Sequence, residues 1–366
     1  MAEAGRRAGD LFLDLLQTLL RLLPWPTETG VRAVGFPDAS SPVLLTGNYA
    51  LTVRRVLRAL EGVDAWLVVA PSAGINVWCA ASGGHLGTHQ VVTALKTSGV
   101  AERVHHRNVI LPQLAATGVI ARDVKRRCGW RARFGPVRAE DIPRYLAQDA
   151  KKSDDMRHVG FDARERSEMA LAWGGPMALA AGLVLAWVHA PWALPVAGYA
   201  LLAAFAAFFA LDRLPAPRRT GFAALVVGVG LGATALAGGG IAALSAAGVS
   251  GGVIAALLTF DYAGSTPIEG GSHFEERRFD VTLDLERCKG VYSCWEVCPE
   301  ACFEKPAPGS EDRRISIAHA ERCVHCGACI VQCSLDALAF EDAAGRRIEP
   351  DAIRRFKLNL LGQRVA

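Results

Sequence analysis

The chain lacks a strong excess of charge of either sign. Its 366 residues include 40 Lys and Arg against 36 Asp and Glu, a formal net charge of +4, and the basic residues are spread over the whole length. Nucleic-acid-binding proteins instead gather basic side chains on one face or along one stripe. We therefore expect no nucleic-acid partner.

Cysteine is scarce until late in the chain. Only Cys79 and Cys128 precede Cys288, and the other eight cysteines lie between Cys288 and Cys333 at the short spacings that metal clusters need. Thiolates that serve as iron ligands imply a reducing compartment. We therefore expect metal sites rather than disulfides, and we expect Cys128 to be buried beside a strand.

No cleavage site of the secretory kind follows the apolar run from Leu11 to Leu23. Polar side chains interrupt this run at Asp14, Gln17 and Arg21, which argues against a signal peptide. The run predicts an amphipathic helix. Such a helix either packs on the first domain or lies on the surface of a bilayer.

Hydrophobic residues make up 51% of the chain, more than a soluble protein normally needs. Four apolar runs follow one another, at about Met169 to Val188, Trp192 to Leu211, Gly221 to Ala237 and Ile241 to Phe260. Each run is near the length that a helix needs to cross roughly 30 Å of hydrocarbon. They predict a transmembrane domain of four helices in two hairpins, and the glycines within them would let the helices approach closely. Buried helices of a large soluble core are the alternative.

The loops between these runs predict an orientation. Arg213, Arg218 and Arg219 lie between the second and third runs, whereas the other two connections are tight and uncharged. By the positive-inside rule, the basic loop is cytoplasmic. Because four crossings return the chain to its starting side, we expect a multi-pass protein of the cytoplasmic (inner) membrane whose two soluble domains both face the cytoplasm.

Between Pro42 and about Leu146 the chain alternates short β-rich runs with helical ones. These runs are Val43 to Leu45, Ala65 to Ala70, Gln90 to Leu95, Asn108 to Leu111 and Arg131 to Phe134. The alternation is typical of an α/β domain with a Rossmann-like parallel sheet.

The C-terminal part contains two cysteine runs. Cys323, Cys326, Cys329 and Cys333 form the full C-x2-C-x2-C-x3-C run of a bacterial dicluster ferredoxin. The upstream run keeps this spacing but has Val291 where the second ligand belongs. We therefore expect an α+β dicluster ferredoxin domain, used for electron transfer, in which one cluster is short of a thiolate.

In such runs the fourth cysteine ligates the other cluster. This crossed ligation assigns a 4Fe-4S cluster to Cys298, Cys323, Cys326 and Cys329. It leaves Cys288, Cys294 and Cys333 for a 3Fe-4S cluster, or for a 4Fe-4S cluster whose last iron binds water or Cys302. Because the stretch from Tyr292 to Phe303 resembles seven-iron ferredoxins, we predict one cluster of each kind. A zinc site is the chemical alternative.

Cys79 lies in the segment Asn76 to Ala81, directly before a glycine-rich helix start. A lone cysteine is most often a small buried hydrophobe. Further motifs accompany it in order, at Thr46 to Tyr49, Ala65 to Val69, Gly87 and Thr88, His106 to Leu114, and Phe134 to Ala139. Together, from about Pro42 to Met156, they resemble the corrinoid-binding domain shared by the acetyl-CoA synthase corrinoid iron-sulfur protein and the mercury-methylation corrinoid protein HgcA.

The later segments resemble the mercury-methylation group more than its soluble relative. Apolar spans follow the corrinoid-type domain, and Asp261 to Pro267 resembles the segment that closes the membrane region in that group. The part beyond Arg277 resembles HgcB, the dicluster ferredoxin that partners HgcA. The resemblance therefore implies a fusion of the two proteins.

The resemblance implies a corrinoid (cobalamin) whose cobalt has Cys79 as lower axial ligand and catalytic residue. A thiolate there is a strong donor that raises electron density on the metal. The other implied cofactor-binding residues are Thr46, Asn76, Val77, Trp78, Ala80, Gly83, Gly87, Thr88, Gln113, Gly135 and Pro136. The glycines would let backbone approach the corrin, although simple loop closure explains them as well. His85 and His89 flank this helix, and we expect them at solvated positions.

The implied function is membrane-anchored, corrinoid-dependent methyl transfer to Hg(II), with a fused low-potential ferredoxin that returns the corrinoid to Co(I). The implied partners are the membrane, a separate methyl-donor enzyme of the methyl-tetrahydrofolate type, an upstream electron donor, and Hg(II) or another soft acceptor.

Two departures from the family keep alternatives open. The segment Ser82 to Gly84 lacks the family's lysine, and the stretch from Leu360 to Ala366 lacks the adjacent cysteines of HgcB. One alternative is a paralogue that transfers methyl to a metalloid or within one-carbon metabolism. The other is a membrane-bound iron-sulfur electron-transfer protein.

The predicted organisation is multidomain. It comprises a lead-in with the amphipathic helix (1–41), the corrinoid-binding domain (42–156), a linker (157–168), the transmembrane domain (169–260), a second linker (261–280), the dicluster ferredoxin domain (281–345) and a tail (346–366).

Overall fold

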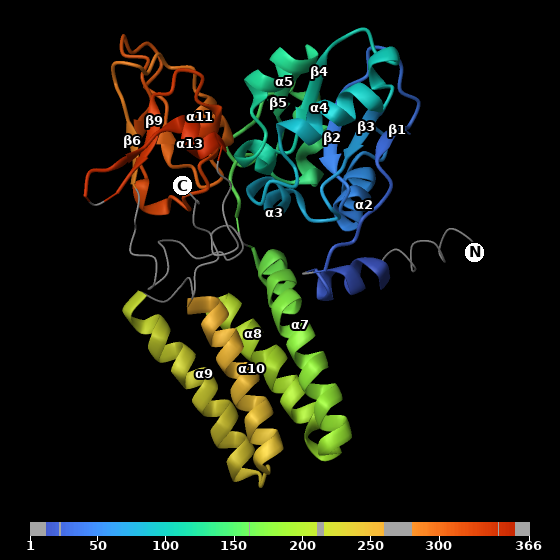
Figure 1. Cartoon of the computed structure of the whole chain (residues 1–366), viewed down its shortest axis with the longest axis vertical. Coiled ribbons are helices and arrows are strands. Elements are labelled where there is room, and N and C mark those ends of the chain that lie inside the picture. Colours follow the sequence, from blue (N-terminus) through green and yellow to red (C-terminus); the bar gives the residue numbers. More distant parts are fainter. Residues whose placement is uncertain are drawn as a thin grey trace. The chain divides into compact units, whose positions relative to one another are not determined.

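The computed structural model describes residues 12–21, 23–160, 162–210, 216–259, 280–342 and 344–355, and of residues 216–220 and 257–259 it describes the backbone alone. The chain forms two compact units, one of Met1–Leu23 with Gly160–Glu276 and the other of Pro24–Val159 with Arg277–Ala366 (Figure 1). We call the first the helical unit. The second contains what we call the α/β region (24–159) and the cysteine-rich region (280–355). The segment Asp261 to Pro267, Arg213 and most of the tail lie outside the described residues.

The α/β region is built on a five-stranded sheet in the order β1-β3-β2-β4-β5. Its strands are β1 (Gly30–Val34), β2 (Val43–Gly47), β3 (Ala65–Ala70), β4 (Asn108–Leu111) and β5 (Arg131–Phe134). The last four are parallel, as predicted, but β1 pairs antiparallel with β3 at the edge. The predicted parallel sheet is therefore corrected to a mixed one. The β1 segment is short and half-buried, so its sequence lacks the apolar run that marks the central strands.

Helices cover both faces of this sheet. The helical segments are α2 (Ala50–Ala59), α3 (Val77–Ser82), α4 (Thr88–Thr97), η1 (Val100–Glu102), η2 (Gln113–Thr117), α5 (Ala121–Cys128), η3 (Ala139–Asp141) and α6 (Ile142–Ala147). Leu44 and Leu67 pack with residues of α2 and α6 in one core, whereas Leu45 and Val68 pack with residues of α3, α4 and α5 in another. The α/β class is thus confirmed, and the run Gln90 to Leu95 belongs to α4.

The helical unit contains α7 (Ala163–Val188), η4 (Ala190–Trp192), α8 (Ala193–Ala210), α9 (Ala216–Leu236) and α10 (Ile241–Thr259). Helix α7 packs along α8 and α9 packs along α10, while α8 also contacts α10. Tyr199 of α8 lies so close to Gly230 and Gly251 that a Cβ at either glycine would overlap its ring. Two of the predicted glycines therefore do permit close helix approach.

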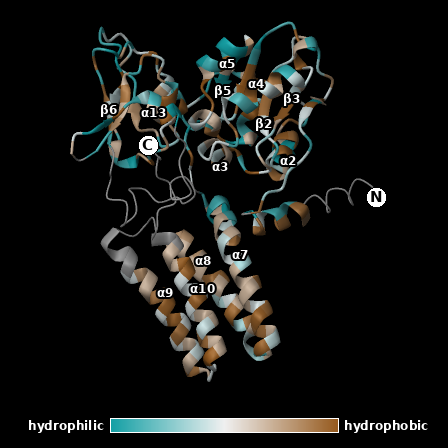
Figure 2. Cartoon of the chain, viewed as in Figure 1, coloured by the Kyte–Doolittle hydropathy of each residue, from teal (hydrophilic) through white to brown (hydrophobic). Residues whose placement is uncertain are grey.

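Two of these helical stretches, Ala163–Val188 and Ala190–Ala210, are long and apolar enough to cross a membrane by length and composition. Gly221–Leu236 and Ile241–Ala256 are shorter apolar stretches. Figure 2 shows hydrophobic residues over much of α8 and α10. Residues 12–19 are helical, and this helix packs on α7, where Gly175 lies against Leu19 and Arg21 pairs with Glu168 at 3.7 Å.

The cysteine-rich region has two small antiparallel sheets and short helices. Its elements are β6 (Asp280–Leu283), α11 (Ser293–Val297), β7 (Phe303–Glu304), β8 (Ser316–Ile317), η6 (Ala320–Arg322), α12 (Ala328–Gln332), β9 (Leu338–Glu341), β10 (Arg347–Ile348) and α13 (Pro350–Arg355). Strands pair in the orders β10-β9-β6 and β7-β8. This α+β content agrees with the predicted ferredoxin domain, whose assignment stays a prediction.

An internal repeat organises this region. Each cysteine of the upstream run has a counterpart 35 positions later, and Val291 is the counterpart of Cys326. The residue that precedes each helix is left-handed, with φ 63° at Tyr292 before α11 and φ 72° at Gly327 before α12. Left-handed residues recur at Ala301 and Asp336, also 35 positions apart. The two cysteine runs therefore fold alike, although one lacks a thiol.

Candidate functional site

Helix α3 carries Cys79 and begins after the loop that follows β3. The segment after β2 holds this loop in place. Asn48, just after β2, accepts hydrogen bonds through Oδ1 from the backbone amides of Ser72 (2.8 Å) and Gly74 (3.0 Å), which follow β3. Parallel strands place these two loops at the same edge of the sheet. The motif from Thr46 to Tyr49 thus shapes the approach to α3.

Cys79 is an exposed, unpaired thiol in the first turn of α3. Asn76 caps the helix, since its Oδ1 accepts from the amide of Cys79 at 3.0 Å, while the neighbouring Val77, Ala80 and Ala81 are buried in the core. Capping of this kind stabilises a helix start by about 1 kcal/mol. The backbone that carries the thiol is therefore held, and the thiol itself faces outward.

The other predicted corrinoid contacts lie on several elements of the α/β region. Asn76, Val77, Trp78, Ala80 and Gly83 belong to α3 or its caps, and Thr46 lies in β2. Gly87 and Thr88 begin α4, and Gly135 and Pro136 follow β5. Gln113 begins η2 and is buried. Their roles toward a corrinoid stay predictions. His85 and His89 are exposed, as expected, and Cys128 is half-buried with its thiol donating to the carbonyl of Val124 at 3.2 Å.

Two polar atoms beside α3 lack hydrogen-bond partners. Thr46 Oγ1, in a side chain only 2% exposed, and Ser82 Oγ are both buried and without a partner. Buried hydroxyls are normally satisfied, so such atoms suit a ligand with polar edges. Together with the exposed thiol of Cys79, they fit the side chains and the metal face of a corrinoid.

Four predicted ligands of the 4Fe-4S cluster line one cavity. Cys298, Cys323, Cys326 and Cys329 surround it, and Cys302 lies in its wall as a fifth thiol. The amide of Cys302 points at the sulfur of Cys298 at 3.4 Å, an arrangement that stabilises a thiolate. The structure thus brings together the four thiols that crossed ligation assigns to one cluster. These residues fit an iron-sulfur cluster.

The three remaining predicted ligands line a second cavity. Cys288, Cys294 and Cys333 face it together with Val291 and Tyr292. At the position equivalent to Cys302, the amide of Ala337 points at the sulfur of Cys333 at 3.3 Å. The second cavity is therefore built like the first, with a methyl-bearing side chain where a thiol would complete it.

The thiols differ in acidity because their surroundings differ. Burial raises the pKa of Cys294 to about 12 and raises that of Cys329 well above its ordinary value. A hydrogen bond from the Cys302 thiol lowers the pKa of Cys298 to about 7, and the same bond raises the pKa of Cys302. Metal binding requires thiolates, so binding of a cluster at Cys294 and Cys329 would release protons.

Among the described residues, no group of three or more His, Cys, Asp or Glu converges as a single metal ion requires. A tetrahedral zinc site with Zn–S bonds of about 2.3 Å needs sulfurs only about 3.8 Å apart. The thiols of a multi-iron cluster stand farther from one another. Zinc at these thiols stays the chemical alternative to the predicted clusters.

Contacts between the α/β region and the cysteine-rich region were not foreseen from the sequence. The side-chain amide of Gln332 donates to the carbonyls of Ala116 (2.8 Å) and Val119 (2.6 Å). Lys152 donates to Gln113 Oε1 (2.8 Å) and to the carbonyl of Glu296 (2.7 Å). No sequence signal marks these residues, because each is an ordinary polar residue until the regions meet.

Arg157 and Lys305 both stack on Trp295. The guanidinium of Arg157 lies 3.4 Å and the Lys305 ammonium 3.3 Å from its ring. Two cations so near one ring must occupy opposite faces, because they would overlap on the same face. Burial beside Arg157 lowers the pKa of Lys152 to about 7, although Glu296 opposes the shift.

Comparison with known proteins finds matches to the N-terminal third of the chain. A family model described as CO dehydrogenase/acetyl-CoA synthase delta subunit matches residues 21–146. Acetyl-CoA decarbonylase/synthase complex subunit gamma of Methanopyrus kandleri is 30% identical over 128 residues, and the gamma 2 subunit of Methanosarcina thermophila is 35% identical over 130 residues. The subunit gamma of Methanothermobacter thermautotrophicus is 35% identical over 125 residues.

Each match covers 34% of this chain and 27% of the relative's own length. The chain thus spans about a quarter of the curated relatives that it matches. The matched segment is the one whose motifs resemble the acetyl-CoA synthase corrinoid protein, and the matches support that resemblance. The family model ends at residue 146, and the predicted fusion of HgcA-like and HgcB-like parts stays a prediction.

Proposed function

We propose that this chain is a membrane-anchored, corrinoid-dependent methyltransferase that carries its own iron-sulfur electron donor. The observation that carries the proposal is the exposed Cys79 thiol, held on a capped helix next to two unpartnered buried hydroxyls. The relatives of this segment are subunits of acetyl-CoA decarbonylase/synthase complexes, which supports methyl transfer as the class of reaction.

The bound corrinoid would supply a cobalt centre that accepts a methyl group and gives it away. The chain's own part would be to hold the cofactor's metal at the Cys79 sulfur, with Asn76 fixing the helical turn and Trp78 beside it. Thr46 and Ser82 would donate or accept hydrogen bonds at the polar edge of the macrocycle. A sulfur ligand on the metal favours transfer to a soft electrophile, and Hg(II) is the acceptor that we propose.

The cysteine-rich region would hold a 4Fe-4S cluster at Cys298, Cys323, Cys326 and Cys329. The second cavity, with Cys288, Cys294 and Cys333, would hold a 3Fe-4S or an incomplete 4Fe-4S cluster. A fused donor keeps the electron source at a high effective concentration beside its acceptor. The methyl donor would be a separate enzyme of the methyl-tetrahydrofolate type, and an upstream reductant would supply the electrons.

The surface of the helical unit supports a membrane location. Large apolar side chains are exposed along it, with Trp187 91%, Leu194 84% and Leu236 92% exposed. In the helix of residues 12–19 the usual burial of apolar side chains and exposure of polar ones is reversed. Gln17 and Thr18 are buried, while Phe12 is 65% exposed. Water disfavours such surfaces, whereas lipid suits them. We propose the cytoplasmic membrane, with both soluble regions on the cytoplasmic side.

Reconstitution of the full chain with cobalamin tests the corrinoid site. We expect optical and EPR spectra of the wild type to show a sulfur ligand on cobalt, and we expect Cys79→Ala to change them. Cys128→Ala is the matched control, since it removes a thiol of the same region. Identical cobalt spectra for wild type and Cys79→Ala would rule out the axial-ligand role.

A second candidate acceptor follows from the comparisons. Because the relatives belong to acetyl-CoA decarbonylase/synthase complexes, the methyl group could instead pass into one-carbon metabolism. Product analysis in cells supplied with Hg(II) and a labelled methyl donor separates the two. Methylmercury that disappears in Cys79→Ala supports the first, and an intact corrinoid site without methylmercury supports the second.

A further inference from the structure

Helix η2 lies between the thiol helix of the α/β region and the cysteine helices. It contacts α3 on one side and α11 and α12 on the other. Gly118, at its end, approaches α3 so closely that a Cβ there would lie 2.5 Å from the carbonyl oxygen of Ala81. Helix η2 therefore connects the helix that carries Cys79 with the helices of the cysteine-rich region.

The two thiol cavities differ in their relation to η2. Cys326 of the four-thiol cavity is 7% exposed and packs in the same core as Val77 and Ala80 of α3 and Ala116 of η2. Its counterpart in the three-thiol cavity, Val291, is 56% exposed. The four-thiol cavity thus faces the Cys79 helix, and the three-thiol cavity faces the surface.

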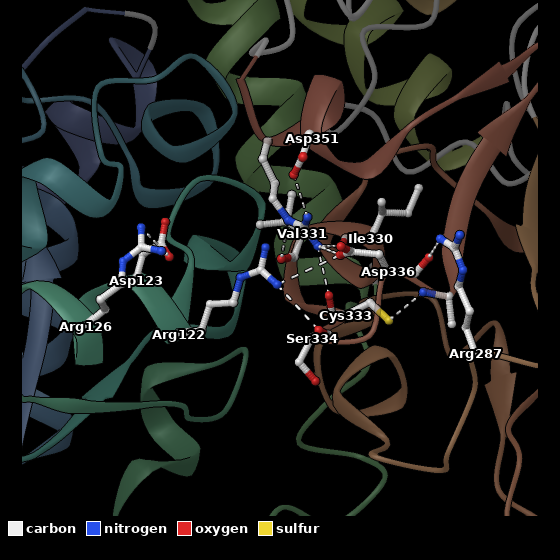
Figure 3. Close-up of polar contacts among 12 residues, drawn as sticks. Arg122, Asp123, Arg126, Arg287, Ile330, Val331, Cys333, Ser334, Asp336 and Asp351 are labelled. Atoms are coloured by element: carbon white, nitrogen blue, oxygen red, sulfur yellow. Dashed lines mark hydrogen bonds and ion pairs between the residues drawn. The ribbon is translucent and has the colours of Figure 1, made fainter.

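Gln332 fastens α12 to the end of η2. Its side chain makes three hydrogen bonds to the backbone of the α/β region, donating to Ala116 and Val119 and accepting from the amide of Ala121 at 3.3 Å. This satisfies nearly the whole hydrogen-bonding capacity of a glutamine amide. Nearby, Arg122 reaches toward Asp336 (3.9 Å) and the carbonyl of Ser334 (3.5 Å), as Figure 3 shows.

Gln113 fastens the other end of η2. Its side-chain nitrogen donates to the carbonyl of Arg157 at 2.7 Å and lies 3.5 Å from that of Cys298, while Lys152 donates to its oxygen. Val159 adds a backbone bond to the carbonyl of Pro299 at 2.8 Å. Both ends of η2 are therefore held by buried or half-buried amides, an arrangement that fixes two regions in one geometry.

We infer that Gln332 and Gln113 form a fixed joint that makes the four-thiol site the direct electron donor to the Cys79 site. This inference rests on the proposed function. It assigns the order in which an electron passes through the two thiol sites. One electron from a low-potential reductant enters at the exposed three-thiol site and passes to the four-thiol site. From there it would cross η2, so that the four-thiol site is oxidised by one electron and the acceptor held at Cys79 is reduced by one.

Hydrogen-deuterium exchange of the full chain with its clusters tests the joint. We expect Gln332→Ala to speed exchange at Ala121 and across residues 113–121 by about tenfold, because two buried carbonyls lose their donors. Gln332→Glu, which keeps the acceptor for Ala121 but loses both donors, should fall between. Gln148→Ala, at an exposed glutamine of the same region, is the control. Iron content should be equal in all four proteins, because no thiol changes.

EPR relaxation tests the order of the two sites. In the chain reconstituted with cobalamin and with its clusters reduced, the nearest cluster speeds relaxation of the cobalt(II) signal. We expect Cys326→Ser to lose this enhancement and Cys288→Ser to keep it. Gln332→Ala, which retains both clusters, should weaken it.

The outcomes separate this inference from the proposed function. Unchanged hydrogen-deuterium exchange in Gln332→Ala would overturn the joint. Loss of the relaxation enhancement in Cys288→Ser but not in Cys326→Ser would overturn the order of the two sites. In both cases cobalamin still binds, so the proposed function is unaffected. If cobalamin does not bind at all, the proposed function fails, and the acceptor named here fails with it.

Discussion

The two halves of the cysteine-rich region have the same local structure but different surroundings. Helices α11 and α12 both follow a left-handed residue, and both halves aim an amide at the sulfur of their last cysteine. They differ at one equivalent position, where Cys326 is buried against the α/β region and Val291 is exposed. Both halves contact the α/β region, but only the downstream half buries a thiol at this equivalent position against it.

This difference indicates how two copies of one structural repeat can have different roles in electron transfer. A complete thiol set buried at an interface suits a permanent donor, because its position is held by core packing. A site with an exposed, incomplete edge suits exchange with an external partner. Equivalent substitutions in the two halves should therefore differ in how much they change cluster content and stability.

The largest effect is expected for Cys329→Ala, compared with Cys294→Ala. Metal-binding free energy, on the order of 10 kcal/mol for structural sites, is also folding free energy. Loss of the four-thiol cluster should therefore lower the stability of the cysteine-rich region, and Cys294→Ala, which removes the other cluster, should lower it less. Iron and sulfide analysis with far-UV circular dichroism measures both. Full iron content in Cys329→Ala would contradict the ligand assignment.

A smaller effect is expected for Gly290→Ala, compared with His325→Ala at the equivalent position. Both residues are left-handed, with φ 69° and 51°, but a Cβ at Gly290 would overlap the carbonyl oxygen of Arg313. We expect Gly290→Ala to destabilise the region by about 2–3 kcal/mol and His325→Ala to cost less. Denaturant unfolding followed by Trp295 fluorescence checks the order, and equal losses would show that the halves differ less than the structure indicates.

Val291→Cys should make the two halves alike. It places a thiol at the position equivalent to Cys326, and the exposed site accepts it without repacking. We expect one additional iron per chain and loss of a 3Fe-4S EPR signal, with little change in stability. Val291→Ala is the control, and it should leave the iron count as in the wild type. An unchanged count in Val291→Cys would mean that the site is already complete through another ligand.

A pH-dependent effect is expected at Lys152, which contacts the first half through Glu296. Burial lowers its pKa from 10.5 to about 7 in the folded chain. Between pH 7 and 10 the folded state then binds fewer protons than the unfolded state, so stability should rise with pH, by up to about 1 kcal/mol per pH unit. Lys152→Met should remove this rise. Thermal unfolding of both proteins from pH 6.5 to 9.5 measures the difference, and parallel curves would contradict it.

Much of the local structure could be predicted because it depends on neighbours in sequence. The four parallel strands, the four long helices and the grouping of thiols into two sets follow from apolar runs and cysteine spacing. Strand β1 was not predicted, since it is only half-buried and lies in the segment assigned to the lead-in before Pro42. The cap that Asn76 makes on the amide of Cys79 agrees with its place directly before the helix.

The sequence by itself determined the elements, the thiol spacing and the motifs around Cys79, since these are set by local geometry and by short repeats. Only the tertiary structure decided which cavity faces α3. Gln332, Gln113, Lys152 and Gly118 have no distinguishing neighbours in sequence, and their hydrogen bonds and close contact join parts of the chain far apart. Such contacts depend on how distant surfaces of the chain fit together after folding. The periodicity of apolar residues along the sequence does not predict them.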